Sequence, residues 1–145
     1  MAINLSKGDN VSFSHSLTNV CVGLGWDPNE GAGHEYDLDA SAFMLGHNGH
    51  LITDEFFVFY NNQLSPDGAV QSTGDDQTGR NSEEGDDETL MVDLAKVDPR
   101  VQEILFTATI YKAEERRQNF GQVSNAYIRF YNSANEEENA RYELN

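Results

Sequence analysis

Acidic residues are concentrated in one stretch of this sequence. Between Asp27 and Asp93 the chain carries 16 Asp and Glu residues and one basic residue, Arg80, so this stretch of 67 residues has a net charge of −15. The rest of the chain has a net charge of −1. Two like charges about 4 Å apart repel by roughly 1 kcal/mol even in water, and by more near a protein surface. A fold of this chain must therefore neutralise the acidic stretch, and either a multivalent cation or a basic protein partner would do so.

Composition limits the class of protein. The chain has 145 residues, 38% of them hydrophobic, with eight Phe and six Tyr, so we expect a single globular domain over residues 1–145 with a real core. With nine basic residues and a net charge of −16, no basic face is available for nucleic acid. No apolar run reaches the roughly 18 residues of a membrane span. Residues 1–14 lack the apolar core of a secretory signal, so we expect a cytoplasmic protein that does not insert into a membrane.

The single cysteine, Cys21, offers neither an internal disulfide nor a zinc cluster. It lies between Val20 and Val22, and we interpret it as a small buried hydrophobic residue.

Most apolar segments alternate with a period of two, which is typical of strands with one buried face. Such segments surround Val11 and Phe13, Leu90 to Leu94, Phe106 to Ile110 and Ala126 to Phe130. Three continuous apolar runs are typical of more deeply buried strands, namely Val20 to Trp26, Ala40 to Leu45 and Phe56 to Tyr60. One or two helical turns are expected at Asp98 to Glu103, where Pro99 follows an acid, and another short turn is expected at Lys112 to Asn119. The pattern predicts an all-β fold, a two-sheet antiparallel β-sandwich with one or two short helices and long acidic loops.

Four acidic segments lie at the ends of predicted strands, and each contains Gly or Asn. They are Gly25–Pro28, Tyr36–Ser41, Asn61–Gly68 and Thr73–Glu88. Calcium takes six to eight oxygen ligands from carboxylates, Asn side chains, carbonyls and water, whereas magnesium retains more water and zinc prefers Cys and His. Asp37 and Asp39, two apart on an extended chain, point the same way. The acids do not match the EF-hand pattern, so the sequence predicts calcium loops of another type.

Other functions have weaker support. No Gly-x-Ser-x-Gly motif marks a hydrolase, and the four histidines lack metal-ligand spacing. Two alternatives stay open. One is an acidic protein–protein interaction module that binds a basic partner. The other is a metal-dependent enzyme acting on phosphorylated substrates, although the sequence identifies no catalytic base for it.

Ordered motifs along the whole chain resemble the TerD family of tellurite-resistance and general stress proteins. They begin with Leu5–Gly8, Gly23–Asp27, Tyr36–Phe43 and Phe59–Asn62, and continue with Ser65–Val70, Thr73–Gly79, Gly85–Glu88, Ala113–Gln118 and Phe120–Ala126. The resemblance implies a calcium-binding β-sandwich with two calcium ions in loops at one end. It implies a bacterial, cytoplasmic, non-enzymatic role in stress response, alongside other TerD-domain proteins and an integral membrane partner.

The resemblance also implies a pool of metal ligands. This pool comprises Asp27, Asp37, Asp39, Asn61, Asp67, Asp75, Asp76, Asp86, Asp87 and Glu88.

The sequence departs from the family pattern in two places. Family members typically continue for a few tens of residues beyond the final Ala140–Leu144 segment, which suggests either a truncated chain or a short member. The link Arg80–Glu84 is longer than the usual glycine-rich link between the two acidic motifs.

Overall fold

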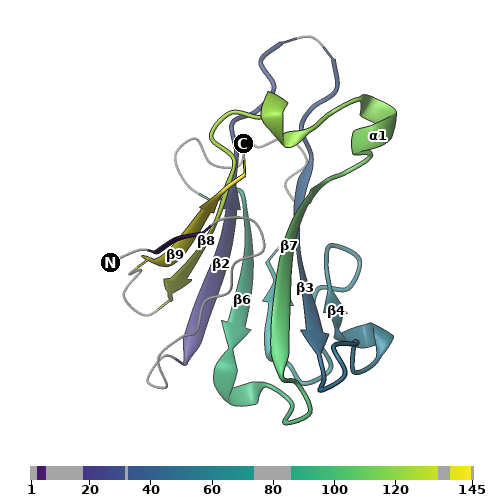
Figure 1. Cartoon of the computed structure of the whole chain (residues 1–145), viewed down its shortest axis with the longest axis vertical. Helices are drawn as coiled ribbons and strands as arrows, with labels where there is room; N and C mark the ends of the chain where they lie inside the picture. The colour runs from purple at the N-terminus through teal and green to yellow at the C-terminus, as the bar shows by residue number, and fades with distance from the viewer. Residues whose placement is uncertain (1–2, 6–17, 32, 74–85, 134–137, 145) are drawn as a thin grey trace.

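The computed structural model describes residues 3–5, 18–31, 33–73, 86–133 and 138–144, and within these ranges nine strands form two sheets (Figure 1). The larger sheet contains, in spatial order, β1 (Ile3–Leu5), β9 (Glu138–Glu143), β8 (Tyr127–Asn132), β2 (Asn19–Gly25), β6 (Glu88–Asp93) and β5 (Val70–Ser72). The smaller sheet contains β4 (Phe57–Val58), β3 (Leu38–Leu45) and β7 (Glu103–Ile110). All described pairings are antiparallel except that of β1 with β9. The predicted two-sheet sandwich is confirmed.

The core lies between the two sheets. Alternate residues of β2 and β6 point into it, including Val22 and Leu24, and Leu90 and Val92. From the smaller sheet, β3 contributes Leu38, Ala40, Ala42 and Met44, each 5% exposed or less. Across the core, the rings of Phe106 on β7 and Phe130 on β8 meet edge to face with centroids 5.4 Å apart. These contacts hold the sheets in the register that brings the start of β3 close to the start of β6.

The outward face of β2 is covered as well, which explains its continuous apolar run. A Cβ atom built on Gly23 would lie 2.3 Å from the carboxyl carbon of Asp86, and one on Gly25 would lie 2.5 Å from the Tyr127 ring. Only glycine leaves room for these two side chains to lie against the strand. The predicted deep burial of this segment is therefore confirmed.

Alternation is also confirmed in β6 and β8, whose inward residues are buried and whose outward residues are more exposed. The alternating segment around Val11 and Phe13 lies outside the described residues.

The strand predicted in the apolar run from Phe56 to Tyr60 is present but covers only part of the run. A 3₁₀ turn, η1 (Asp54–Phe56), leads into the two-residue strand β4. The chain then turns back, because Phe59 and Asn62 exchange backbone hydrogen bonds of 3.1 and 3.0 Å. The Asn62 side chain stabilises this turn by donating to the carbonyls of Glu55 and Phe57.

Of the two predicted short helices, the second is confirmed as α1 (Ala113–Arg116). At the first, one turn forms and no helix: Asp98 accepts through its side chain from the Arg100 amide, and the Val101 amide closes a single turn on the Asp98 carbonyl. These local bonds satisfy the backbone without a helix, and β7 begins at Glu103. Two further 3₁₀ turns, η2 (Leu94–Lys96) and η3 (Phe120–Gln122), follow β6 and precede β8. None of the described helices is long and apolar enough to cross a membrane.

Candidate metal site

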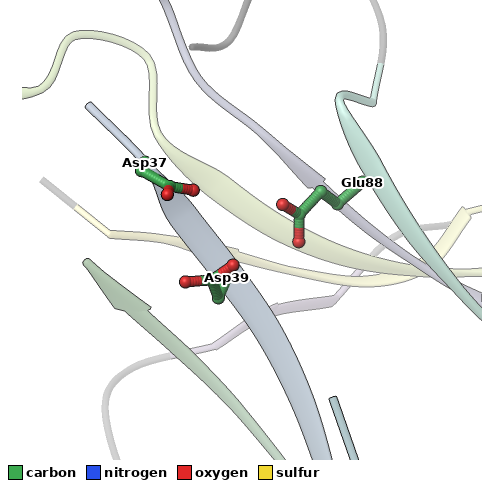
Figure 2. Close-up of side chains that lie close together, drawn as sticks. All are labelled: Asp37, Asp39 and Glu88. Carbon is green, nitrogen blue, oxygen red and sulfur yellow. The ribbon is translucent and has the colours of Figure 1, made fainter. Parts of the chain in front are cut away.

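Three buried carboxylates converge at the start of β3, beside the edge of that strand that faces β6. Asp37, Asp39 and Glu88 each offer one oxygen, and these three oxygens lie within 4.8 Å of one another (Figure 2). The three residues are 5%, 6% and 7% exposed. They come from segments about 50 residues apart in the chain, so tertiary packing assembles the cluster.

Asp37 and Asp39 flank the first residue of β3, and their spacing of two places both side chains on the same side of the strand. Glu88 is the first residue of β6 in the other sheet. Its Oε1 accepts a hydrogen bond of 3.2 Å from the amide of Ala40. That amide lies on the edge of β3 away from β7, and the described pairing of β4 with β3 is confined to Ala42 and Phe43. Glu88 therefore binds the part of this edge that β4 leaves uncovered.

The segment before β6 is attached to the end of β2. The Asp87 amide donates to the Leu24 carbonyl at 2.8 Å, and Asp87 Oδ2 accepts from the Trp26 amide at 2.9 Å. The Trp26 ring nitrogen in turn donates to the Tyr36 carbonyl at 3.0 Å, next to Asp37. Trp26 thus links the chain on both sides of the cluster, and Asp87, 8% exposed, holds the backbone beside Glu88 in place.

The donor set of this cluster fits a hard divalent cation. At an effective dielectric constant of about 20, two carboxylates 4.8 Å apart repel by about 3 to 4 kcal/mol, so a bound cation would relieve a large local repulsion. Two ligand oxygens on opposite sides of one calcium ion are about 4.8 Å apart, twice a bond length of 2.3–2.6 Å. Oxygens within that span can therefore bind one ion. The cluster is composed of carboxylates, without His or Cys, which disfavours zinc.

Asp86 points away from this cluster. Its two oxygens accept from Arg129 Nε and Nη2, both at 2.9 Å, and Oδ1 also accepts from the Tyr127 hydroxyl at 2.8 Å. The chain bends at Asp87, so Asp86 covers the outer face of β2 at Gly23 while Glu88 points inward. The hydrogen bond from Arg129 to Asp86 raises the pKa of Arg129, and burial, followed by that carboxylate, raises the pKa of Tyr127. The charge of Asp86 is neutralised by a basic residue of the chain itself.

The remaining predicted ligands are dispersed. Asp27 follows β2, and its Oδ2 accepts from the Asn125 side chain at 2.8 Å. Asn61 lies exposed in the turn after β4. Asp75 and Asp76 lie outside the described residues.

Asp67 lies near the opposite end of the sandwich from Glu88. It precedes β5, whose Val70 pairs with Val92 toward the end of β6, whereas Glu88 begins β6. Its carboxylate accepts from the Ser65 hydroxyl at 2.5 Å and from the amides of Ala69 and Asp98 at 3.0 and 2.8 Å. These bonds close the turn before β5 and attach it to the segment that leads to β7.

The structure identifies two supporting residues that sequence reasoning did not single out, Arg129 and Asn125. Arg129 alternates with Tyr127 and Tyr131 on β8. This placement of one cation between two aromatic residues is the sequence feature that could have identified Arg129 as a partner for an acid. Asn125 has a φ of +54°, and its position in a tight turn brings its amide to Asp27.

Comparison with known proteins agrees with the sequence motifs. The family model described as the TerD domain matches residues 1–145. The tellurium resistance protein TerD of Serratia marcescens is 51% identical over 99% of this chain and 76% of its own length. General stress protein 16U of Bacillus subtilis (strain 168) is 44% identical, with the same coverage of both chains.

The fold comparison is consistent with this result. A crystal structure of a homologue of telluride resistance protein (TerD) from Streptomyces coelicolor A3(2) superposes with a TM-score of 0.70 over 87% of this chain and 71% of that chain, at 22% identity. Its similarity concerns the fold. From the family model and the two relatives we conclude that this chain belongs to the TerD domain family.

Proposed function

We propose that this protein is a calcium-binding, non-enzymatic stress-response protein. The observation that supports the proposal most strongly is the buried cluster of Asp37, Asp39 and Glu88, three carboxylates whose oxygens lie within 4.8 Å of one another. A cluster of this kind in a chain of net charge −16 favours a divalent cation with oxygen ligands. Backbone carbonyls and water would complete the coordination of the ion.

The names of the relatives support the physiological part of the proposal. Proteins that share 44–51% identity with this chain are named for tellurium resistance and for general stress. We propose a corresponding bacterial, cytoplasmic role, with other TerD-domain proteins and a membrane protein of the stress system as partners. The two-ion expectation is part of the proposal: the first ion binds the cluster, and the second binds elsewhere in the acidic stretch.

The experiment is calorimetric titration of the metal-free protein with calcium, using Asp39→Asn beside the unaltered chain. This change keeps the shape of the side chain and removes one of the three converging charges. We expect it to weaken binding at the cluster at least about tenfold, which corresponds to about 1.4 kcal/mol. Any second ion should retain its affinity, so the titration also gives the number of sites.

The control is Asp54→Asn, which removes an exposed acid in η1 and the same unit of net charge. Its calcium affinity should stay within about twofold, because exposed charges contribute little at physiological salt. Equal weakening by both changes would mean that calcium senses only net charge, and the cluster would lose its assignment. If the protein does not bind calcium at all, the acidic interaction module that binds a basic partner becomes the favoured hypothesis.

A further inference from the structure

Trp26 is the single tryptophan of the chain and follows the last residue of β2. It is 4% exposed and belongs to the hydrophobic core. Its backbone amide donates to Asp87 Oδ2 at 2.9 Å, and its ring nitrogen Nε1 donates to the Tyr36 carbonyl at 3.0 Å. Each acceptor belongs to a residue next to the carboxylate cluster, because Tyr36 precedes Asp37 and Asp87 precedes Glu88.

The position of Trp26 is fixed by the backbone on both sides of it. Gly25 ends β2 and pairs with Tyr127 of β8. On the other side, the Asp27 amide donates to the Ser124 carbonyl at 3.0 Å. The indole ring is rigid and has only two side-chain torsions. Its N–H group is therefore held in one place relative to the larger sheet.

The bond from this N–H group connects the two segments that carry the cluster. Asp37 and Asp39 lie at the start of β3 in the smaller sheet, whereas Glu88 begins β6 in the larger sheet (Figure 2). Like charges repel, so without a cation the carboxylates tend to separate the two segments. The bond from Trp26 to the Tyr36 carbonyl opposes this separation, because breaking it would leave the N–H of a buried ring without an acceptor.

We propose that Trp26 is a positioning residue for the cation, a role that rests on the calcium-binding function proposed above. Its indole N–H holds Tyr36, and through it Asp37, at the spacing from Glu88 that one calcium ion requires. Selectivity between calcium and magnesium depends on the size of the site, the number of ligands and their flexibility. A cluster held at a fixed spacing discriminates between the two ions better than a loose one. Trp26 thus contributes to the preference for calcium as well as to the affinity.

Core packing alone is the competing explanation for Trp26, and an isosteric side chain separates the two roles. In benzothienylalanine a sulfur atom replaces the indole N–H, and the ring keeps nearly the same size and shape. Because the chain has one tryptophan, global replacement of tryptophan changes only this position. The isostere therefore removes the bond to the Tyr36 carbonyl and keeps the packing. The matched control is Phe130→Leu, which alters packing in a core residue of β8.

The first measurement is made in chelator and needs no bound metal. The Ala40 amide donates to Glu88 Oε1, so hydrogen exchange at this amide reports whether the start of β3 stays on β6. The isostere should speed exchange at Ala40 at least about tenfold, because local opening becomes easier. The Asp93 amide, which donates to the Ala69 carbonyl at the other end of β6, should keep its rate. An unchanged rate at Ala40 would overturn the positioning role whether or not calcium binds.

The second measurement is calorimetric titration with calcium and with magnesium. The isostere should bind calcium about tenfold more weakly, as is typical when a residue that orients a metal ligand is changed, and its calcium-to-magnesium affinity ratio should fall. Phe130→Leu, verified as folded by circular dichroism, should keep both values. If the isostere keeps them too, the positioning role is wrong and the calcium function stands. If the unaltered chain binds no calcium, the calcium function is wrong, and the role of Trp26 in ion binding is overturned with it.

Discussion

At the scale of single residues, the run Asp86, Asp87 and Glu88 shows how three adjacent acids acquire three different environments. Glu88 joins the buried cluster, Asp87 binds the Trp26 amide, and Asp86 forms a two-bond ion pair with Arg129. The division follows from the bend at Asp87 and from the space above Gly23, which accommodates the Asp86 carboxylate. Composition alone does not distinguish the three residues, whereas their contacts in the fold do.

The pair of Asp86 and Arg129 leads to a prediction about stability. The Asp86 side chain is 7% exposed, so Arg129→Met should leave a buried carboxylate without its cation and destabilise the protein by about 3–5 kcal/mol. The double variant Asp86→Asn with Arg129→Met removes both charges and should recover a large part of that loss. Urea unfolding in chelator measures both effects apart from any metal. If the double variant is no more stable than Arg129→Met alone, the ion pair is not the reason for the loss.

At the scale of elements, the outer face of β8 combines cations with aromatic rings. The Arg129 guanidinium lies 4.3 Å from the centre of the Tyr131 ring, and Arg141 on β9 lies 4.1 Å from that of Tyr127. Such stacking stabilises a strand face that is only partly covered. Burial of Tyr131, together with a hydrogen bond involving Cys21, raises the pKa of this residue to about 12.

This shift predicts a loss of stability in alkali. A tyrosine in the unfolded chain ionises near pH 10, whereas Tyr131 in the folded chain holds its proton to about pH 12. Its contribution is therefore fully present below pH 10 and is lost as the pH rises from about 10 to 12. The Tyr131→Phe variant should lose stability less steeply between about pH 10 and 12 than the unaltered chain does. Unfolding followed by circular dichroism as a function of pH measures this difference. Identical slopes for the variant and the unaltered chain would mean that Tyr131 does not contribute.

At the scale of the whole molecule, the acidic stretch contributes strands to both sheets while carrying most of the negative charge. Its described acids are separated by the fold: Asp67 is near one end of the sandwich, Asp86 is on an outer face, and Asp37, Asp39 and Glu88 are clustered at the start of β3. Separation lowers the mutual repulsion of the first two but leaves the cluster of three carboxylates close together. Calcium should therefore act on global stability through this cluster.

We expect calcium to raise the melting temperature and chelator to reverse the rise. At a hundredfold excess over the dissociation constant, an ion that binds only the folded state stabilises it by about 2.7 kcal/mol. For a chain of this size that corresponds to a rise of roughly 5–10 °C. Sodium chloride at equal ionic strength should raise the melting temperature by less, because it screens exposed charges more than buried ones. Equal shifts with both salts would indicate screening without a site.

The sequence by itself determined the fold class and several strands of this protein. The alternation of apolar and polar residues in β6 and β8, and the continuous apolar runs in β2 and β3, are local patterns. They can be seen in the sequence without any tertiary contact. Asp37 and Asp39 were identifiable as a pair on one side of a strand for the same reason. The resemblance to the TerD family also rested on ordered motifs along the chain, and the family model confirms it.

Only the tertiary structure decided which acids meet. Glu88 joins Asp37 and Asp39 because β6 packs against an uncovered edge of β3, and Asp86 instead pairs with Arg129, 43 residues away. At Asp98 a single turn forms and no helix, because the side chain and carbonyl of this residue bind nearby amides. Each of these outcomes depends on which groups form hydrogen bonds with each other, either between segments or within a turn. Residue type and spacing in the sequence do not determine these partners. The acidic stretch thus indicates a need for neutralisation, and packing determines which carboxylates are left for a cation to neutralise.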